Sequence, residues 1–194
     1  MVLDPDAGDA RHLPVQTGSD RLLAAMNRRH SIADFLRIVE RLRAARADMA
    51  FSSDFIVGHP GESDADHAAT LSLVREVGFA QAYSFKYSPR PGTPASGAPL
   101  HVSEAEKDQR LQSLQALLRS HTEKFNAGCV GLTVPVLITG AGRHPGQIAG
   151  RSPWLQPVHL SGPASLAGQV VPVRIKAAHT NSLSGDLQQE RACA

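Results

Sequence analysis

One stretch decides the fold: Ser52-Ser53-Asp54-Phe55-Ile56-Val57-Gly58-His59-Pro60-Gly61-Glu62-Ser63. Its apolar run, Phe55-Ile56-Val57, is typical of a buried parallel strand, and the glycines that follow permit backbone conformations or close approaches that a Cβ would prevent. A helix is expected at once, because Ser63 and Asp66 have capping-box spacing. The loop would then lie at the strand edge where α/β folds bind ligands. A plain strand-to-helix connection is the alternative, since glycine-rich turns are weak motifs.

The same alternation of strand and helix extends to both sides of this stretch. The expected elements are extended segments at 13–15, 49–57 and 82–87, helices near 20–26, 31–42 and 63–77, and a long helix from about residue 103. Strand, helix, strand, helix, strand is a parallel β/α arrangement. Right-handed crossovers would bring the turns at Gln16, Gly58 and Ser88 to one edge of the sheet.

From Gly128 onward the pattern becomes all-β. Short segments divided by Gly, Pro and Asn lie at 130–139, 147–151, 157–160, 169–178 and 182–187. About five such strands are typical of a small OB-like barrel. The sequence therefore predicts an α/β domain over residues 1–127, an all-β domain over 128–188, and a tail at 189–194.

Charge divides unevenly between these parts. Residues 1–127 hold 15 Lys and Arg against 16 Asp and Glu, whereas residues 128–188 hold 4 against 1. The second part is thus mildly cationic, which suits a polyanionic partner but is also found on ordinary surfaces.

Cysteine content and hydropathy bear on the cellular compartment. Cys129 and Cys193 are the only cysteines, too few for a disulfide framework or a thiolate metal site, so two free thiols are expected. No apolar run is long enough to cross a bilayer, and the N-terminus lacks the basic-then-apolar order of a signal peptide. These features predict a cytoplasmic protein without a membrane partner.

The central loop carries side chains that could act chemically. Asp54 and Glu62 flank it and could form an acid/base pair, although an aspartate at a strand end more often holds neighbouring backbone. His59 and His67 could ligate a metal, but their spacing matches no zinc motif, and loop histidines are more often polar surface. The sequence assigns no catalytic residue and no metal ligand.

Cations are the other candidates. Arg28, Arg29 and Arg90 could bind phosphate or could be solvated surface charges. In the β domain, cations would contact phosphates while Trp154 stacks on an unpaired base, or Trp154 would instead complete the barrel core. The candidates for nucleic-acid contact are Arg143, His144, Arg151, Trp154, Arg174, Lys176 and Asn181.

Four motifs in order resemble the methylthiotransferase branch of the radical-SAM enzymes. They are His12-Leu-Pro-Val-Gln-Thr-Gly-Ser19, Met26-Asn-Arg-Arg-His30, Asp54-Phe-Ile-Val-Gly-His-Pro-Gly-Glu62 and Phe85-Lys-Tyr-Ser-Pro-Arg-Pro-Gly-Thr93. The second motif, with Arg151-Ser-Pro-Trp-Leu-Gln-Pro-Val158 and Asn181-Ser-Leu-Ser-Gly185, is similar in particular to the MiaB type, the tRNA-2-methylthio-N6-dimethylallyladenosine synthases.

This resemblance implies an architecture. The family has an N-terminal methylthiotransferase domain, a radical-SAM partial β/α barrel and a C-terminal TRAM domain that contacts RNA. The chain resembles the C-terminal half of the partial barrel followed by the OB-like TRAM barrel. The family's Cys-x-x-x-Cys-x-x-Cys loop for a 4Fe-4S cluster is absent, so this chain is expected to lack the methylthiotransferase and cluster-binding portions of such an enzyme.

The resemblance also implies site residues. His59 departs from the family's commoner phenylalanine, while both glycines of the loop are kept. S-adenosylmethionine would contact Gln16, Ser19, Asp54, Ile56, Gly58, Phe85, Tyr87 and Ser88. RNA would contact Arg143, Arg151, Trp154, Arg174, Lys176 and Asn181.

The expected function is that of a radical-SAM tRNA methylthiotransferase, which adds a 2-methylthio group to N6-isopentenyladenosine beside the anticodon with S-adenosylmethionine and 4Fe-4S clusters. Without cluster cysteines, the isolated chain is expected to be inactive. The alternatives are a non-catalytic RNA-binding module and a ribosomal-protein methylthiotransferase; the motif Met26–His30 argues against the latter. A half barrel would expose a parallel edge, which predicts poor solubility or self-association.

Overall fold

The computed structural model describes residues 10–98 and 102–188, and the chain divides into two compact units. The first covers Arg11–His121, and the second contains the residues from Thr122 onward. None of the described helices has both the length and the apolar composition needed to cross a bilayer.

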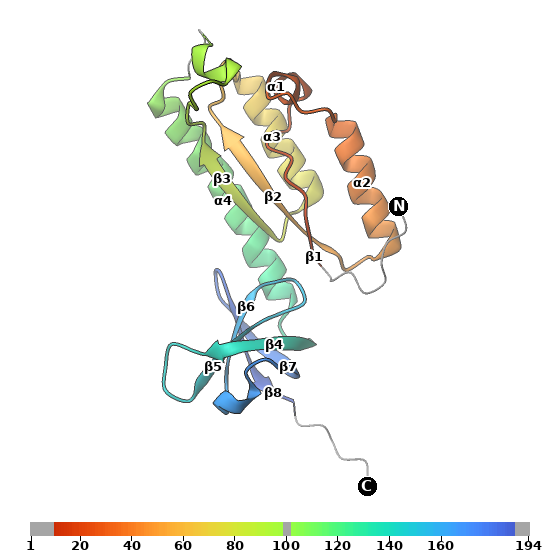
Figure 1. Cartoon of the computed structure of the whole chain (residues 1–194). Helices are drawn as coiled ribbons and strands as arrows, with labels where there is room; N and C mark the ends of the chain where they lie inside the picture. Colours follow the sequence, from red (N-terminus) through yellow and green to blue (C-terminus); the bar gives the residue numbers. More distant parts are fainter. Residues whose placement is uncertain (1–9, 99–101, 189–194) are drawn as a thin grey trace. The chain divides into compact units, whose positions relative to one another are not determined.

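The first unit is built on a three-stranded sheet of order β1-β2-β3 (Figure 1). The strands are β1 (Ala10–His12), β2 (Ala50–Val57) and β3 (Gln81–Lys86), and β2 runs parallel to β3. The helices are α1 (Asp20–Ala25), α2 (Ile32–Ala45), α3 (Asp64–Val77), the 3-10 turn η1 (Pro94–Gly97) and α4 (Glu104–Gly128), whose residues from Thr122 onward belong to the second unit. The predicted β/α alternation is confirmed. The strands β1 and β3 are the two edges of this sheet, and self-association stays a prediction.

The first strand differs from the prediction. Its regular part is β1, upstream of the expected 13–15, but pairing with β2 continues beyond it: Leu13 N–H donates to the Ser52 carbonyl at 2.8 Å and Gln16 N–H to the Asp54 carbonyl at 2.9 Å. Pro14 has no N–H to donate, and Gln16 has a left-handed backbone with φ of 76°. These two residues therefore interrupt the regular ladder without ending the contact.

The helix ends follow from the capping residues. Ser31 with Asp34 and Ser63 with Asp66 both form complete capping boxes, in which each side chain bonds the other's backbone N–H. Gly78 ends α3 in the left-handed conformation, with φ of 61°. The box formed by Ser63 and Asp66 is the one expected from their spacing, and the structure confirms it.

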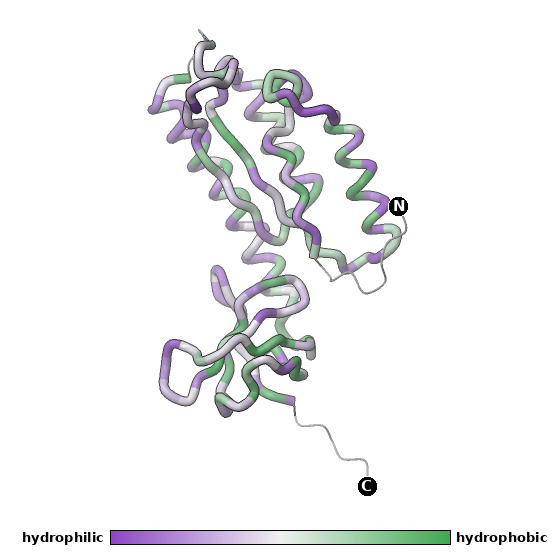
Figure 2. The backbone as a smooth tube through the Cα atoms, in the orientation of Figure 1, coloured by the Kyte–Doolittle hydropathy of each residue, from purple (hydrophilic) through white to green (hydrophobic). Residues whose placement is uncertain are grey.

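The core of the first unit lies on one face of the sheet. Along β2, Phe55 and Val57 are buried, whereas Ile56 is half-buried on the opposite face. The Phe55 ring meets Phe79 edge-on at 5.4 Å, and Phe79 lies 6.5 Å from Phe35 of α2. Ile56 is therefore not buried as the apolar run Phe55-Ile56-Val57 had indicated, because helices cover only the other face (Figures 1 and 2).

The second unit contains a closed barrel of order β4-β5-β6-β8-β7. Its strands are β4 (Thr133–Ala141), β5 (Gln147–Arg151), β6 (Pro157–Ser161), β7 (Val170–Ala178) and β8 (Leu183–Leu187), with the 3-10 turn η2 (Ala164–Leu166) before β7. Inward-facing Val136, Ile138 and Leu183 are fully buried. The predicted five-stranded barrel is confirmed, and its closure is consistent with an OB-like fold.

Candidate functional site

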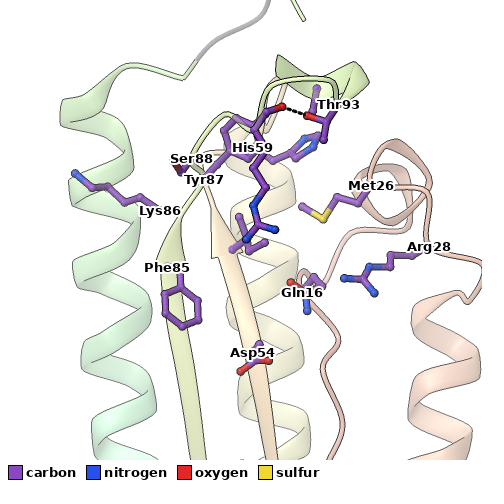
Figure 3. A pocket seen from close by; sticks show the side chains of 13 residues that line it. Gln16, Met26, Arg28, Asp54, His59, Phe85, Lys86, Tyr87, Ser88 and Thr93 are labelled. Carbon is purple, nitrogen blue, oxygen red and sulfur yellow. Dashed lines mark hydrogen bonds between the residues drawn. The ribbon is translucent and has the colours of Figure 1, made fainter. Parts of the chain in front are cut away.

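A cavity of about 630 Å³ lies in the first unit at the carboxyl ends of the strands (Figure 3). Its walls come from the segment before α1, the turn after α1, the open face of β2, the end of β3 and the irregular segment that follows β3. The lining residues are Gln16, Met26, Arg28, Asp54, Ile56, His59, Phe85, Lys86, Tyr87, Ser88, Arg90, Thr93 and Ala95.

Gln16 is held at this cavity by its backbone. Its N–H donates to the Asp54 carbonyl and its own carbonyl accepts from Ile56 N–H, both at 2.9 Å. With φ of 76°, a residue other than glycine carries a conformational cost of roughly 1 kcal/mol. The two hydrogen bonds hold the residue in this conformation, and its side chain lies at the cavity wall.

Asp54 brings a carboxylate to the open face of β2. Its Oδ2 lies 3.3 Å from His12 Nε2, while His12 Nδ1 lies 3.0 Å from the Ser52 hydroxyl. The imidazole thus bridges two β2 side chains and orients the carboxylate beside Ile56. Asp54 lines the cavity and Glu62 does not, so the cavity lining gives no support to the acid/base pair considered from the sequence.

The apolar part of the cavity contains an exposed aromatic side chain. Phe85 is 55% exposed and lies next to Ile56 across the β2–β3 ladder, where the two are register partners. Tyr87 meets the His59 ring edge-on at 5.2 Å. Burial lowers the pKa of His59, which keeps its imidazole neutral at physiological pH. The side chains of Ile56 and Phe85 together offer an apolar surface against which a planar ligand could pack.

Two arginines add positive charge. Arg28 and Arg90 both line the cavity, and neither guanidinium has a carboxylate partner within the described part of the chain. Lys86 differs, because its ammonium pairs with Asp108 at 2.9 Å and Glu104 at 3.3 Å and points toward α4 (Figure 3). The cavity therefore offers two free cations to an anionic group.

Two of the predicted cofactor residues lie outside the cavity lining. Ser19 is buried, caps α1 by accepting from Leu22 N–H, and donates its hydroxyl to Asp66 at 2.5 Å. Gly58 donates its N–H to Glu62 at 2.6 Å, and a Cβ built on it would lie 2.3 Å from Lys107 Cγ. Both positions support the elements around the cavity.

Glu62 belongs to a buried ion pair. Its carboxylate accepts from Arg110 Nη1 at 2.9 Å, and Arg110 also donates to the exposed Asp64 at 2.8 Å. Burial raises the pKa of Glu62 above its ordinary value, against the opposing effects of the Gly58 N–H and Arg110. This glutamate stabilises the loop and lies outside the cavity lining.

The residues do not fit a metal ion or an iron–sulfur cluster. Across residues 10–98 and 102–188, no three His, Cys, Asp or Glu side chains gather as a metal site would require. His67 bonds the Ser113 hydroxyl at 2.9 Å, and burial lowers its pKa. Cys129 is a free, buried thiol in the barrel core, and burial raises its pKa. Cys193 lies outside the described residues.

The predicted RNA-binding cations lie in two settings: Arg143 is in the turn between β4 and β5, and the other three are on strands β5 and β7. Arg143, Arg151, Arg174 and Lys176 are all exposed, and Lys176 pairs with Asp186 at 3.3 Å. Asn181 is also exposed, in the turn between β7 and β8.

Trp154 is arranged differently from these cations. It is half-buried and meets the Phe125 ring edge-on at 5.7 Å, against the barrel core. Of the two roles left open for Trp154, packing against the core is therefore the one that the geometry favours.

Sequence reasoning missed Leu155. This side chain is 60% exposed, and its backbone is left-handed with φ of 67°. No sequence signal could have found it, because leucine is a poor residue for a left-handed turn and is ordinarily expected inside a core.

Two protein-family models match parts of the chain. Residues 5–74 match the family model of the Radical SAM superfamily. The closed barrel gives the second match. Residues 128–187 are a TRAM domain. The chain thus combines a radical-SAM segment with a TRAM domain. The first includes β2 and most of α3, and the second contains all five barrel strands. This combination is consistent with the methylthiotransferase family and with RNA-modifying radical-SAM enzymes.

Proposed function

We propose that this chain is part of a MiaB-type tRNA methylthiotransferase, an enzyme that adds a 2-methylthio group to N6-isopentenyladenosine beside the anticodon. The observation that carries this proposal is the cavity, which gathers six of the eight residues expected to contact S-adenosylmethionine. In this proposal the three-stranded sheet is the C-terminal half of the radical-SAM partial barrel.

The cavity residues suit the different parts of S-adenosylmethionine. Ile56 and Phe85 would pack against the faces of the adenine ring. Gln16 and the oriented Asp54 carboxylate would hold polar groups of the ribose and the amino-acid end. Arg28 or Arg90, free of carboxylates, would bind the methionine carboxylate. Bound beside a reduced 4Fe-4S cluster, this cofactor supplies a carbon-centred radical.

The cluster itself is not accommodated by these residues. The sequence has two cysteines, one of them buried in the TRAM barrel. The Cys-x-x-x-Cys-x-x-Cys loop of the family that the chain resembles has three at close spacing. In the proposed enzyme the cluster ligands come from polypeptide outside these 194 residues. The role of this chain is then to contribute one side of the cofactor pocket and to bind the RNA.

Binding of S-adenosylmethionine to the purified chain tests the proposal, with saturation-transfer NMR as a readout suited to weak binding. The variant Phe85→Ser removes an aromatic wall of the cavity, and we expect it to weaken binding at least about tenfold. Tyr83→Ser is the matched control, because Tyr83 is 52% exposed on the same strand but does not line the cavity. Binding that saturates with S-adenosylmethionine concentration and is lost only in Phe85→Ser supports the proposal. Equal losses in both variants contradict it, and so does an NMR signal that keeps rising with ligand concentration.

A non-catalytic RNA-binding module is the second candidate, and the lack of cluster cysteines favours it. The two functions differ in one measurement. A module of this kind binds RNA through its TRAM domain but shows no saturable binding of S-adenosylmethionine.

A further inference from the structure

The turn between β5 and β6 presents an apolar side chain to solvent from an unfavourable backbone conformation. Leu155 has φ of 67° and is 60% exposed. The conformation disfavours any residue with a Cβ, and the exposure gives up the burial that would ordinarily stabilise a leucine. Folding alone gives no reason for a leucine at this position.

Several hydrogen bonds fix this turn from within. The Ser152 hydroxyl accepts from the N–H of Trp154 at 3.3 Å and of Gln156 at 3.2 Å, and it also lies 2.9 Å from Gln156 Oε1. The Gln156 amide in turn donates to Asn126 at 2.5 Å. Since Ser152, Gln156 and Asn126 are all buried, the turn is anchored in the body of the unit.

Arg151 links the turn to the outer face of the barrel. Its Nη1 donates to the Leu155 carbonyl at 3.0 Å, which leaves the other guanidinium donors free. Across the β4–β5 ladder, Arg151 is the register partner of Leu137, and across the β4–β7 ladder Leu137 is the partner of Val170. Leu137 and Val170 are 44% and 63% exposed. An apolar row on the barrel surface therefore ends at Arg151, beside Leu155.

The charge of this unit favours an anionic partner. Residues 128–188 carry 4 cations against the single acid Asp186, which pairs with Lys176, and within the described residues Arg151 has no carboxylate partner. An apolar surface next to an oriented, unpaired guanidinium is complementary to a nucleotide, whose base is flat and apolar on its faces and whose phosphate is anionic.

We propose that Leu155 and Arg151 form one RNA contact, in which an unpaired base rests on the Leu155 side chain and Arg151 binds the adjacent phosphate. This inference rests on the proposed RNA-binding function and names the residues that carry it. The strained turn then favours binding, because it holds the Leu155 side chain outward in the geometry of the bound state. Less conformational entropy is therefore lost when RNA binds.

Glycine and asparagine at position 155 test the contact without disturbing the turn, since both residues adopt the left-handed conformation readily. Leu155→Gly and Leu155→Asn should melt at or above the temperature of the wild type. Leu132→Ala is the matched control, because Leu132 is 45% exposed in the same unit but precedes β4 and lies outside the β5–β6 turn. Arg151→Gln tests the phosphate contact.

The experiment is fluorescence anisotropy of the full chain over a potassium chloride series, with an RNA hairpin whose loop is unpaired and a fully paired RNA duplex. We expect both Leu155 variants to bind the hairpin about fivefold to tenfold more weakly with an unchanged salt slope, and to bind the duplex as the wild type does. Arg151→Gln should lower the salt slope by about one for both RNAs.

The outcomes separate the two proposals. If both Leu155 variants bind the hairpin as tightly as the wild type does, this inference is overturned. The proposed RNA binding is then unaffected. Equal losses of affinity for hairpin and duplex also overturn it. A fully paired duplex offers no unpaired base, so losing a contact with an unpaired base cannot weaken duplex binding. If the wild type binds neither RNA at low salt, the proposed RNA-binding function itself fails, and this inference fails with it.

Discussion

The Arg110 guanidinium on α4 donates to the buried Glu62 carboxylate at 2.9 Å and to the Glu62 carbonyl at 3.0 Å. Glu62 Oε2 also accepts the Gly58 N–H, so one carboxylate ties both ends of the loop after β2 to α4. The loop that the sequence marks as a ligand loop is thus largely a structural junction. His59 is its one side chain that lines the cavity.

Removing Arg110 should be strongly destabilising. In Arg110→Met the Glu62 carboxylate stays buried without its cation, and breaking a buried pair in this way costs roughly 3 kcal/mol. Chemical denaturation at neutral pH measures the loss. Arg37→Met is the control, because Arg37 pairs with Asp34 at the surface, where such a pair contributes about 0.5 kcal/mol or less. Similar losses in both variants would contradict the role given to Arg110.

The pH dependence of that loss has a definite sign. Burial already raises the pKa of Glu62, so its contribution to stability is full below the unfolded-state pKa and is lost as the pH rises through the folded-state pKa. Without Arg110 the pKa rises further. The stability difference between wild type and Arg110→Met should therefore widen as the pH is raised from about 4 to about 8. A difference that narrows over this range would show that Glu62 is not the group responsible.

Two glycine positions separate backbone strain from a steric clash. Gly58 and Gly78 both have positive φ, 73° and 61°, but only at Gly58 would a Cβ meet another side chain, that of Lys107. We expect Gly78→Ala to cost about 1 kcal/mol and Gly58→Ala clearly more. Thermal unfolding compares the two variants. The double variant Gly58→Ala with Lys107→Ala should recover part of the difference, and no recovery would rule out the clash as its cause.

The β5–β6 turn depends on a residue that lies far from it in the sequence. Asn126 is buried, accepts from the Gln156 amide, and donates to the His179 carbonyl at 3.0 Å. Asn126→Ala would leave these groups unpaired, at a cost of about 2 kcal/mol in the free energy of unfolding. Asn181→Ala, at an exposed position, should change stability little. If Asn126→Ala left the free energy of unfolding equally unchanged, water would have to replace the lost hydrogen bonds.

Anaerobic reconstitution with iron and sulfide should give no stoichiometric cluster. Cys129 is buried in the barrel core, and burial raises its pKa, which disfavours the thiolate that a cluster requires. Absorption spectra and iron content are the measurements, with Cys129→Ser as the control that should behave identically. A cluster band that disappears in Cys129→Ser would contradict this prediction and the cofactor assignment with it.

Local signals in the sequence were reliable where a short-range rule determines structure. Both capping boxes, the glycine that ends α3 and the barrel strands follow from spacing and turn chemistry. Burial was less predictable. The run Phe55-Ile56-Val57 indicated a strand covered on both faces, but helices cover only one, and Ile56 instead lines the cavity.

The cofactor residues were expected from the resemblance to the methylthiotransferase family and not from spacing alone. Six of the eight line the cavity, at the common edge where parallel strands end. Ser19 and Gly58 lie at that edge too, but they bond neighbouring elements, which depends on tertiary contacts that spacing does not encode. Leu155 could not be found at all, since its left-handed backbone is imposed by Ser152, Gln156 and Arg151.

The left-handed backbone of Gln16 has a consequence for laboratory evolution. Glycine at position 16 would relieve the strain and keep both hydrogen bonds to β2, so a selection for heat resistance alone should enrich it. The same change removes the amide side chain from the cavity wall. Selection for heat resistance and selection for ligand retention should therefore choose opposite residues at this one position.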